Sequence, residues 1–200
     1  RRVLIDKEVT LIVVSKNFLF ADFEPILKLG HKNFGENRVQ EAYSKWRALI
    51  DSDNEIKLHM LGKVQSNKVL DVVNLFDYVH SLDSEKLAEK FSLEESKQNK
   101  NLKYFIQINI ANEKQKSGID INEIENFFNL CKNKLSLNII GLMCLPPINQ
   151  DPVPYFAKLR ELASRIQVKD LSMGMSNDYL LALEQGSTFI RIGSKIFGNR

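Results

Sequence analysis

The sequence has little of what marks a secreted or membrane protein. Cys131 and Cys144 are its only cysteines, and they form no CxxC pair. The chain therefore offers no disulfide framework, which favours a reducing compartment. We expect both thiols to be buried and to behave as small hydrophobic side chains.

Long apolar runs and basic blocks are also missing. No run approaches the ~18 residues of a membrane-spanning helix, and the first residues do not resemble a signal peptide. The net charge is +3, but lysines and acids are interleaved along the chain. These absences predict a cytoplasmic protein that binds neither membranes nor nucleic acid. The chain begins at Arg1 without a methionine, so we expect an N-terminal piece to precede it.

What is present suits one globular domain over residues 1–200. The chain has 200 residues, 44% of them hydrophobic, and shows neither a linker nor a low-complexity segment. One α/β barrel can take all of this length.

The segment from Thr10 to Lys16 is the most informative part of the chain. Leu11, Ile12, Val13 and Val14 are consecutive aliphatic residues, the pattern of a strand that is buried on both faces in a parallel sheet. An amine at the C-terminal end of such a strand lies where α/β folds place their chemistry. Lys16 is therefore a candidate for imine formation, although from this strand alone a solvated lysine is the better explanation, because lysine is mostly exposed in proteins.

Strand and helix patterns alternate along the rest of the chain. Asp22 and Ser84 are expected to cap helices, and Gly30 is expected to end one. Strands are predicted at residues 10–16, 31–34, 56–61, 78–80, 104–110, 138–143, 171–173 and 188–192, and helices at residues 21–30, 38–50, 68–76, 84–91, 119–131, 154–166 and 178–183. Such alternation favours a closed parallel (β/α)8 barrel of the TIM type, with an open doubly wound sheet as the alternative.

Two loops of this barrel suit a phosphate group. Barrels commonly hold phosphate with the loops that follow strands seven and eight. Here those loops are residues 174–178 and 193–195, and both offer small residues and a hydroxyl. Each alone is an ordinary turn, but together with Lys16 they indicate a phosphorylated ligand that carries an aldehyde.

Arg191 interrupts the last predicted strand. A buried guanidinium is costly unless it is paired with a carboxylate or faces a polar ligand, and the sequence leaves both possibilities open. A cation near Lys16 would favour the neutral amine, which imine formation requires.

Several segments, taken in order, resemble the pyridoxal phosphate homeostasis protein family (the YggS/PROSC family). The resemblance runs from about Val9 to the C-terminus, with Leu58 where an aromatic residue is usual and Ser194 where threonine is common. The matching segments are VVSK (13–16), FGENRVQE (34–41), HMLGKVQSNK (59–68), HSLD (80–83), GLMCLPP (141–147), LSMGMS (171–176) and IRIGSKIFG (190–198).

This resemblance implies a barrel of the alanine racemase N-terminal domain kind that binds pyridoxal 5'-phosphate (PLP). Lys16 would carry PLP as an aldimine, and Arg191 would face the pyridine nitrogen. The phosphate would lie against Ser176 and the turn of Gly193 and Ser194. Asn37 and His59 would lie beside the ring.

The resemblance also implies a carrier or regulator of PLP without catalytic turnover, so we expect a monomer whose partners are PLP and PLP-accepting apoenzymes. Only residues 193–200 follow the last strand, and we expect no room there for the second domain that a racemase uses. Three alternatives remain open. One is a racemase-like PLP enzyme that uses Tyr43, His59 or His80 as a proton carrier, and another is a class I aldolase-like barrel without PLP. The third is a non-enzymatic interaction module without any ligand.

Overall fold

A ring of parallel strands forms the centre of the protein. We describe residues 8–52, 55–113 and 117–198 of a computed structural model. Each strand pairs in parallel with the next, and β8 pairs with β1, so the sheet closes into a barrel. The strands are β1 (Thr10–Val14), β2 (Asn33–Glu36), β3 (Lys57–Met60), β4 (Tyr78–Leu82), β5 (Lys103–Gln107), β6 (Asn138–Met143), β7 (Asp170–Met175) and β8 (Phe189–Ile192).

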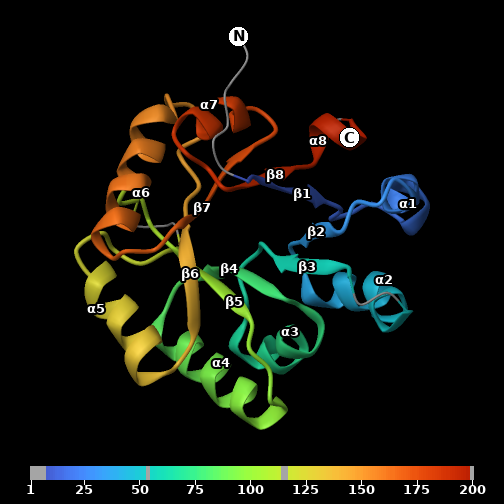
Figure 1. Cartoon of the computed structure of the whole chain (residues 1–200), viewed down its shortest axis with the longest axis horizontal. Coiled ribbons are helices and arrows are strands. Elements are labelled where there is room, and N and C mark those ends of the chain that lie inside the picture. The colour runs from blue at the N-terminus through green and yellow to red at the C-terminus, as the bar shows by residue number, and fades with distance from the viewer. Residues whose placement is uncertain (1–7, 53–54, 114–116, 199–200) are drawn as a thin grey trace.

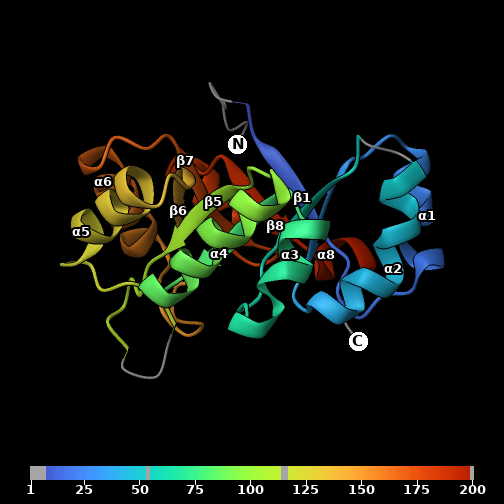
Figure 2. The same cartoon turned by 90° about the horizontal axis from the view of Figure 1, so that it is seen from below.

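Helices surround the ring on its outer side (Figure 1). Seen from the side, α1 and α2 lie at one end of the molecule and α5 and α6 at the other (Figure 2). The helices are α1 (Phe20–Lys28), α2 (Val39–Ser52), α3 (Val69–Leu75), α4 (Glu85–Gln98), α5 (Ile124–Asn129), α6 (Val153–Arg165), α7 (Tyr179–Glu184) and α8 (Ser194–Phe197). The predicted (β/α)8 barrel is confirmed, and the open-sheet alternative is wrong.

Two hydrophobic clusters build this architecture. The larger one fills the layer between helices and strands, and Leu58 and Trp46 belong to it. The smaller one lies inside the barrel and contains Ile12, Phe105 and Phe189. Leu58 packs outward while its neighbour His59 is buried among interior rings, because successive side chains of a strand point to opposite faces.

Several predicted boundaries are wrong for identifiable reasons. The helix predicted at residues 119–131 begins only at Ile124, because Ile119 forms a parallel bridge with Ile108 beyond β5. It continues as a π-helix over Leu130–Lys134. Strand five ends at Gln107 instead of Ile110. The predicted loop at residues 193–195 contains the first turn of α8.

The predicted helix caps are partly confirmed. Ser84 is the N-cap of α4, but its side chain makes no capping hydrogen bond. In α1 the N-cap is Leu19, and the Asp22 carboxylate accepts a hydrogen bond from the Leu19 backbone N–H at 2.8 Å. Pro25 therefore lies inside the helix and not in its first turn.

Cys131 and Cys144 are buried and form no disulfide, as expected. Burial raises the pKa of each thiol to about 12, so both are held protonated and unreactive near neutral pH. Within the described residues, no helix is both long and apolar enough to cross a membrane.

Candidate cofactor site

Lys16 lies at the C-terminal mouth of the barrel. It is exposed and follows β1 directly, in the turn that leads to α1. A cavity of about 580 Å³ opens beside it, and its walls come from the loops after β1, β6, β7 and β8. The predicted site residues that line this cavity are Lys16, Ser176, Arg191, Gly193 and Ser194.

Ser176 lies where backbone donors from the β8 loop converge. Its Oγ accepts the N–H of Gly193 at 3.3 Å and the N–H of Lys195 at 3.4 Å. An anion that takes the place of this hydroxyl as acceptor meets both N–H groups, and the Ser176 hydroxyl can donate to it as well. The arrangement suits a phosphate group.

A glycine sets the direction of the segment that carries Ser176. Gly174 has a φ of +93°, and the register between β7 and β8 shifts between Ser172 and Met175. A Cβ at residue 174 would lie 2.6 Å from the Ala182 Cβ of α7. Only glycine therefore combines this backbone turn with close packing of α7.

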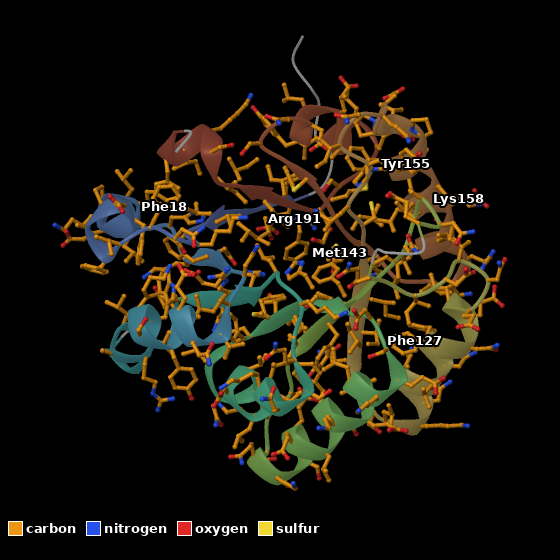
Figure 3. All side chains as sticks on the ribbon, turned by 180° about the vertical axis from the view of Figure 1, so that it is seen from behind. Phe18, Phe127, Met143, Tyr155, Lys158 and Arg191 are labelled. Carbon is orange, nitrogen blue, oxygen red and sulfur yellow. The ribbon has the colours of Figure 1, made fainter. Side chains whose placement is uncertain are left out.

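Arg191 points into the barrel (Figure 3), and its side chain is held by neutral oxygen atoms. Nη1 donates to the Ser172 carbonyl at 2.9 Å and to the Ser172 Oγ at 2.7 Å, and Nη2 donates to the Cys144 carbonyl at 3.1 Å. Among the described residues no carboxylate lies within ion-pair distance of Arg191, so the Arg–carboxylate possibility is wrong. Burial lowers the pKa of the guanidinium.

A buried ionic cluster holds the turn that carries Lys16. The Lys45 ammonium of α2 donates to the backbone carbonyls of Ser15 at 2.8 Å and Phe18 at 3.3 Å. It also pairs with Glu36 at 2.7 Å. The fully buried Glu36 carboxylate accepts the Ser15 hydroxyl at 2.8 Å and the Trp46 indole N–H at 3.0 Å. The backbone on both sides of Lys16 is thereby tied to α2.

This cluster was not predicted from the sequence. Glu36 is the residue that could have indicated it. An acidic residue at the end of a buried strand needs a polar or charged partner, as the buried Arg191 does. The identity of that partner had no sequence signal, because Lys45 resembles any helical surface lysine.

Asn37 and His59 do not line the Lys16 cavity. Asn37 faces a neighbouring cavity of about 400 Å³ at the same mouth, together with Leu61 and Lys63. His59 is fully buried inside the barrel, where its Nδ1 contacts the His80 Nε2 at 3.0 Å. The further proton-carrier candidate Tyr43 packs against the outer hydrophobic cluster.

Comparison with known proteins identifies the family. Residues 5–200 match the family described as alanine racemase, N-terminal domain. A pyridoxal phosphate homeostasis protein of Aquifex aeolicus is 37% identical over 86% of this chain and 78% of its own length. That of Pasteurella multocida is 34% identical over 98% and 88%. The chain belongs to the pyridoxal phosphate homeostasis protein family.

Solved structures agree with this family assignment. PipY of Synechococcus elongatus PCC7942 without PLP has a TM-score of 0.89 and 34% identity over 95% of this chain and 93% of its own. PipY with PLP bound has a TM-score of 0.87 and 34% identity over 95% and 92%. Alanine racemase of Corynebacterium glutamicum shares the fold, with a TM-score of 0.72 and 15% identity over 96% of this chain and 56% of its own.

Proposed function

We propose that this chain binds PLP covalently through Lys16 and acts in PLP homeostasis. The observation that carries this proposal is the meeting of Lys16, Ser176, Arg191 and Gly193 in one cavity. Lys16 lies far from the other three in the sequence, so their convergence is a property of the folded barrel. PipY, which is similar over nearly all of this chain, has been solved with PLP bound.

The residues fit the chemical groups of PLP. The exposed Lys16 amine is free to attack the aldehyde that PLP supplies. The Ser176 hydroxyl and the N–H groups of Gly193 and Lys195 provide donors for the phosphate. Pro147 and Met175 provide apolar cavity wall for the ring. Ser194, exposed at the start of α8, provides a further hydroxyl at this turn.

Arg191 favours a binding role over catalysis in this proposal. A guanidinium beside a pyridine nitrogen disfavours protonation of that nitrogen, which weakens PLP as an electron sink. We therefore propose a PLP carrier without catalytic turnover, monomeric and cytoplasmic, whose recipients are PLP-accepting apoenzymes. Asn37 and His59 stay predictions as residues beside the ring.

The test is an absorption spectrum of the purified protein after incubation with PLP and desalting. We expect a retained band that borohydride fixes and that peptide mass spectrometry assigns to Lys16. Lys16→Ala should lose this band. Lys63→Ala should keep it, because Lys63 is another exposed lysine at the same mouth.

Other outcomes would separate the alternatives. A wild-type protein without a retained band contradicts PLP binding and favours the aldolase-like barrel, as does trapping of a carbonyl substrate on Lys16 without a chromophore. Racemisation of alanine by the PLP-loaded protein contradicts the carrier role and favours a racemase-like enzyme.

A further inference from the structure

A chain of polar side chains crosses the otherwise apolar interior of the barrel. It starts at Arg191, whose Nη1 lies 2.7 Å from the Ser172 Oγ, and the same Oγ lies 2.8 Å from the His80 Nδ1. The His80 Nε2 lies 3.0 Å from the His59 Nδ1, and the His59 Nε2 lies 3.1 Å from the Asn33 Oδ1. Ser172, His80 and His59 are fully buried.

The chemistry of its two ends gives this chain a direction. Arg191 can only donate, and the Asn33 Oδ1 can only accept. Because His59 donates from Nε2 to Asn33, its Nδ1 must accept from the His80 Nε2. The His80 Nδ1 then accepts the Ser172 hydroxyl proton, and the Ser172 Oγ accepts from Arg191. Each of the four hydrogen bonds of the chain has one donor and one acceptor when both histidines are neutral Nε2–H tautomers.

The reverse direction is less well satisfied. It would place both histidines in the Nδ1–H form, with His80 donating to the Ser172 Oγ. That oxygen would then accept two hydrogen bonds, and the Ser172 hydroxyl proton would have no acceptor within the chain. A buried donor without a partner costs free energy, so the first direction is favoured.

Aromatic rings fix the planes of both imidazoles. Tyr78 stacks on His59 with a centroid distance of 4.3 Å and an angle of 15°. Phe105 stacks on His80 at 4.3 Å and 19°, and Phe189 meets His80 edge-on at 6.0 Å. Neither ring can turn without disturbing this packing, so the hydrogen-bond directions are held in place.

Burial also keeps both imidazoles neutral. Desolvation lowers the pKa of His59 to about 3, and the nearby charges of His31 and Lys103 act in the same direction. Desolvation lowers the pKa of His80 too, with His59 and Arg191 adding to the effect. The hydrogen-bond direction from Arg191 to Asn33 requires both imidazoles to be neutral.

The chain leaves two N–H groups of Arg191 available. Both N–H groups of Nη1 are used by Ser172, and one N–H of Nη2 is used by Cys144. Within the part of the chain that the structure describes, the Nε–H and the second N–H of Nη2 remain. Arg191 also lines the Lys16 cavity, so these two groups are the donors that it can offer to a ligand there.

We propose that Ser172, His80, His59 and Asn33 are positioning residues that hold these two N–H groups of Arg191 toward the ring of the bound cofactor. This inference rests on the proposed function, because it needs PLP in the Lys16 cavity. Ser172 accepts hydrogen bonds from the guanidinium. His80 and His59 keep the Ser172 hydroxyl proton directed toward His80, and therefore away from Arg191.

The first test needs no cofactor. A long-range ¹H–¹⁵N spectrum of the histidine-labelled protein reports the tautomer of each ring, and the chain has only three histidines. His31→Gln removes the third set of signals. We expect His59 and His80 in the Nε2–H form, unchanged between pH 5 and pH 8. Nδ1–H forms, or protonation in this range, would overturn the chain.

The second test measures PLP affinity and the pH dependence of the absorption band of the lysine-bound cofactor. Ser172→Ala should weaken PLP binding roughly tenfold, the effect of one hydrogen bond to a charged group, and should shift the pH dependence. His80→Leu should resemble Ser172→Ala. His80→Asn should restore wild-type behaviour in part, because its amide oxygen can replace Nδ1 as an acceptor.

Ser187→Ala is the matched control. Ser187 is also buried, and its hydroxyl donates to the Met173 carbonyl at 2.7 Å, outside the chain. It should lose stability while its PLP affinity stays within about twofold of wild type. Unchanged affinity and spectrum in both Ser172→Ala and His80→Leu would overturn the positioning role.

The two tests separate failure of this inference from failure of the proposed function. A wild-type protein that retains no PLP contradicts the proposed function and the positioning role with it, whereas the tautomer spectrum still decides whether the chain exists. A protein that retains PLP with the wrong tautomers contradicts only the inference.

Discussion

At the scale of single residues, Gly174 decides where Ser176 points. Its φ of +93° is a conformation that residues with a Cβ rarely adopt, and α7 packs directly against it. The site therefore depends on a residue that contributes no functional group of its own.

Gly174→Ala should lower the free energy of unfolding by roughly 2 kcal/mol or more, since the left-handed backbone alone costs about 1–2 kcal/mol. The contact with Ala182 adds to this cost. Gly30→Ala is the matched control, because Gly30 has a φ of +85° but nothing within 4 Å of its added Cβ. Urea unfolding of both variants checks the difference, and equal losses would contradict the role of α7 packing.

Ser176→Ala should reduce PLP affinity by roughly 1.5–3 kcal/mol, the range for a hydrogen bond to a charged group. Isothermal titration of the two proteins with PLP measures this loss. Ser164→Ala is the control, because its hydroxyl only donates to the Arg160 carbonyl within α6. An unaltered affinity in Ser176→Ala would place the phosphate elsewhere in the cavity.

At the scale of elements, α2 acts on the site through Lys45 although it contributes no residue to the cavity wall. Lys45 links α2 to the turn after β1 and to the last residue of β2. The pair ties the three elements together, because the fully buried Glu36 depends on Lys45 for compensation of its charge.

Lys45→Met should destabilise the protein by about 3–5 kcal/mol, because it leaves the fully buried Glu36 without its counter-charge. Lys28→Met, which removes an exposed pair with Glu24, should cost at most about 1 kcal/mol. Chemical denaturation compares the two. A small loss in Lys45→Met would contradict a stabilising role for this buried pair.

Element prediction succeeded where one strand or helix alone carried the signal. The run of aliphatic residues in β1 and the periodic apolar face of α6 identified those elements correctly. The start of α5 was missed because the pairing of Ile119 with Ile108 is a contact between separate segments. Residues 119–131 have the apolar pattern of a helix, but Ile119 pairs with Ile108 as in a sheet, so the helix begins only at Ile124.

At the scale of the whole molecule, the barrel interior is unusual in placing histidines among aromatic rings. The folded state holds His59 at a pKa of about 3, whereas the unfolded chain has the ordinary value of 6.5. The unfolded state therefore binds more protons between these values. The stabilisation is complete above about pH 6.5 and is lost as the pH falls toward 3.

Stability should consequently fall by about 2 kcal/mol between pH 7 and pH 5 through His59 alone, and His80 acts in the same direction. His59→Gln should lose this share of the pH dependence, even though its absolute stability is lower. Urea unfolding at pH 5, 6 and 7 measures both slopes. Identical slopes in the two proteins would contradict a neutral buried His59.

The sequence by itself determined the barrel, the position of Lys16 and the two small loops that approach the cavity. These features depend on local patterns: aliphatic runs, helical periodicity and glycine-containing turns. Lys16 and Arg191 were recognisable because each is a charged residue attached to a buried strand.

Only the tertiary structure decided which partners these charges have. Arg191 is bound by neutral oxygen atoms of Ser172 and Cys144, and the turn that carries Lys16 is held by Lys45 and Glu36 from other elements. Closure of the barrel brings together side chains that lie far apart in the sequence, and desolvation then makes their hydrogen bonds obligatory. No local pattern carries that information, because the partners come from separate strands and helices that meet only in the folded barrel.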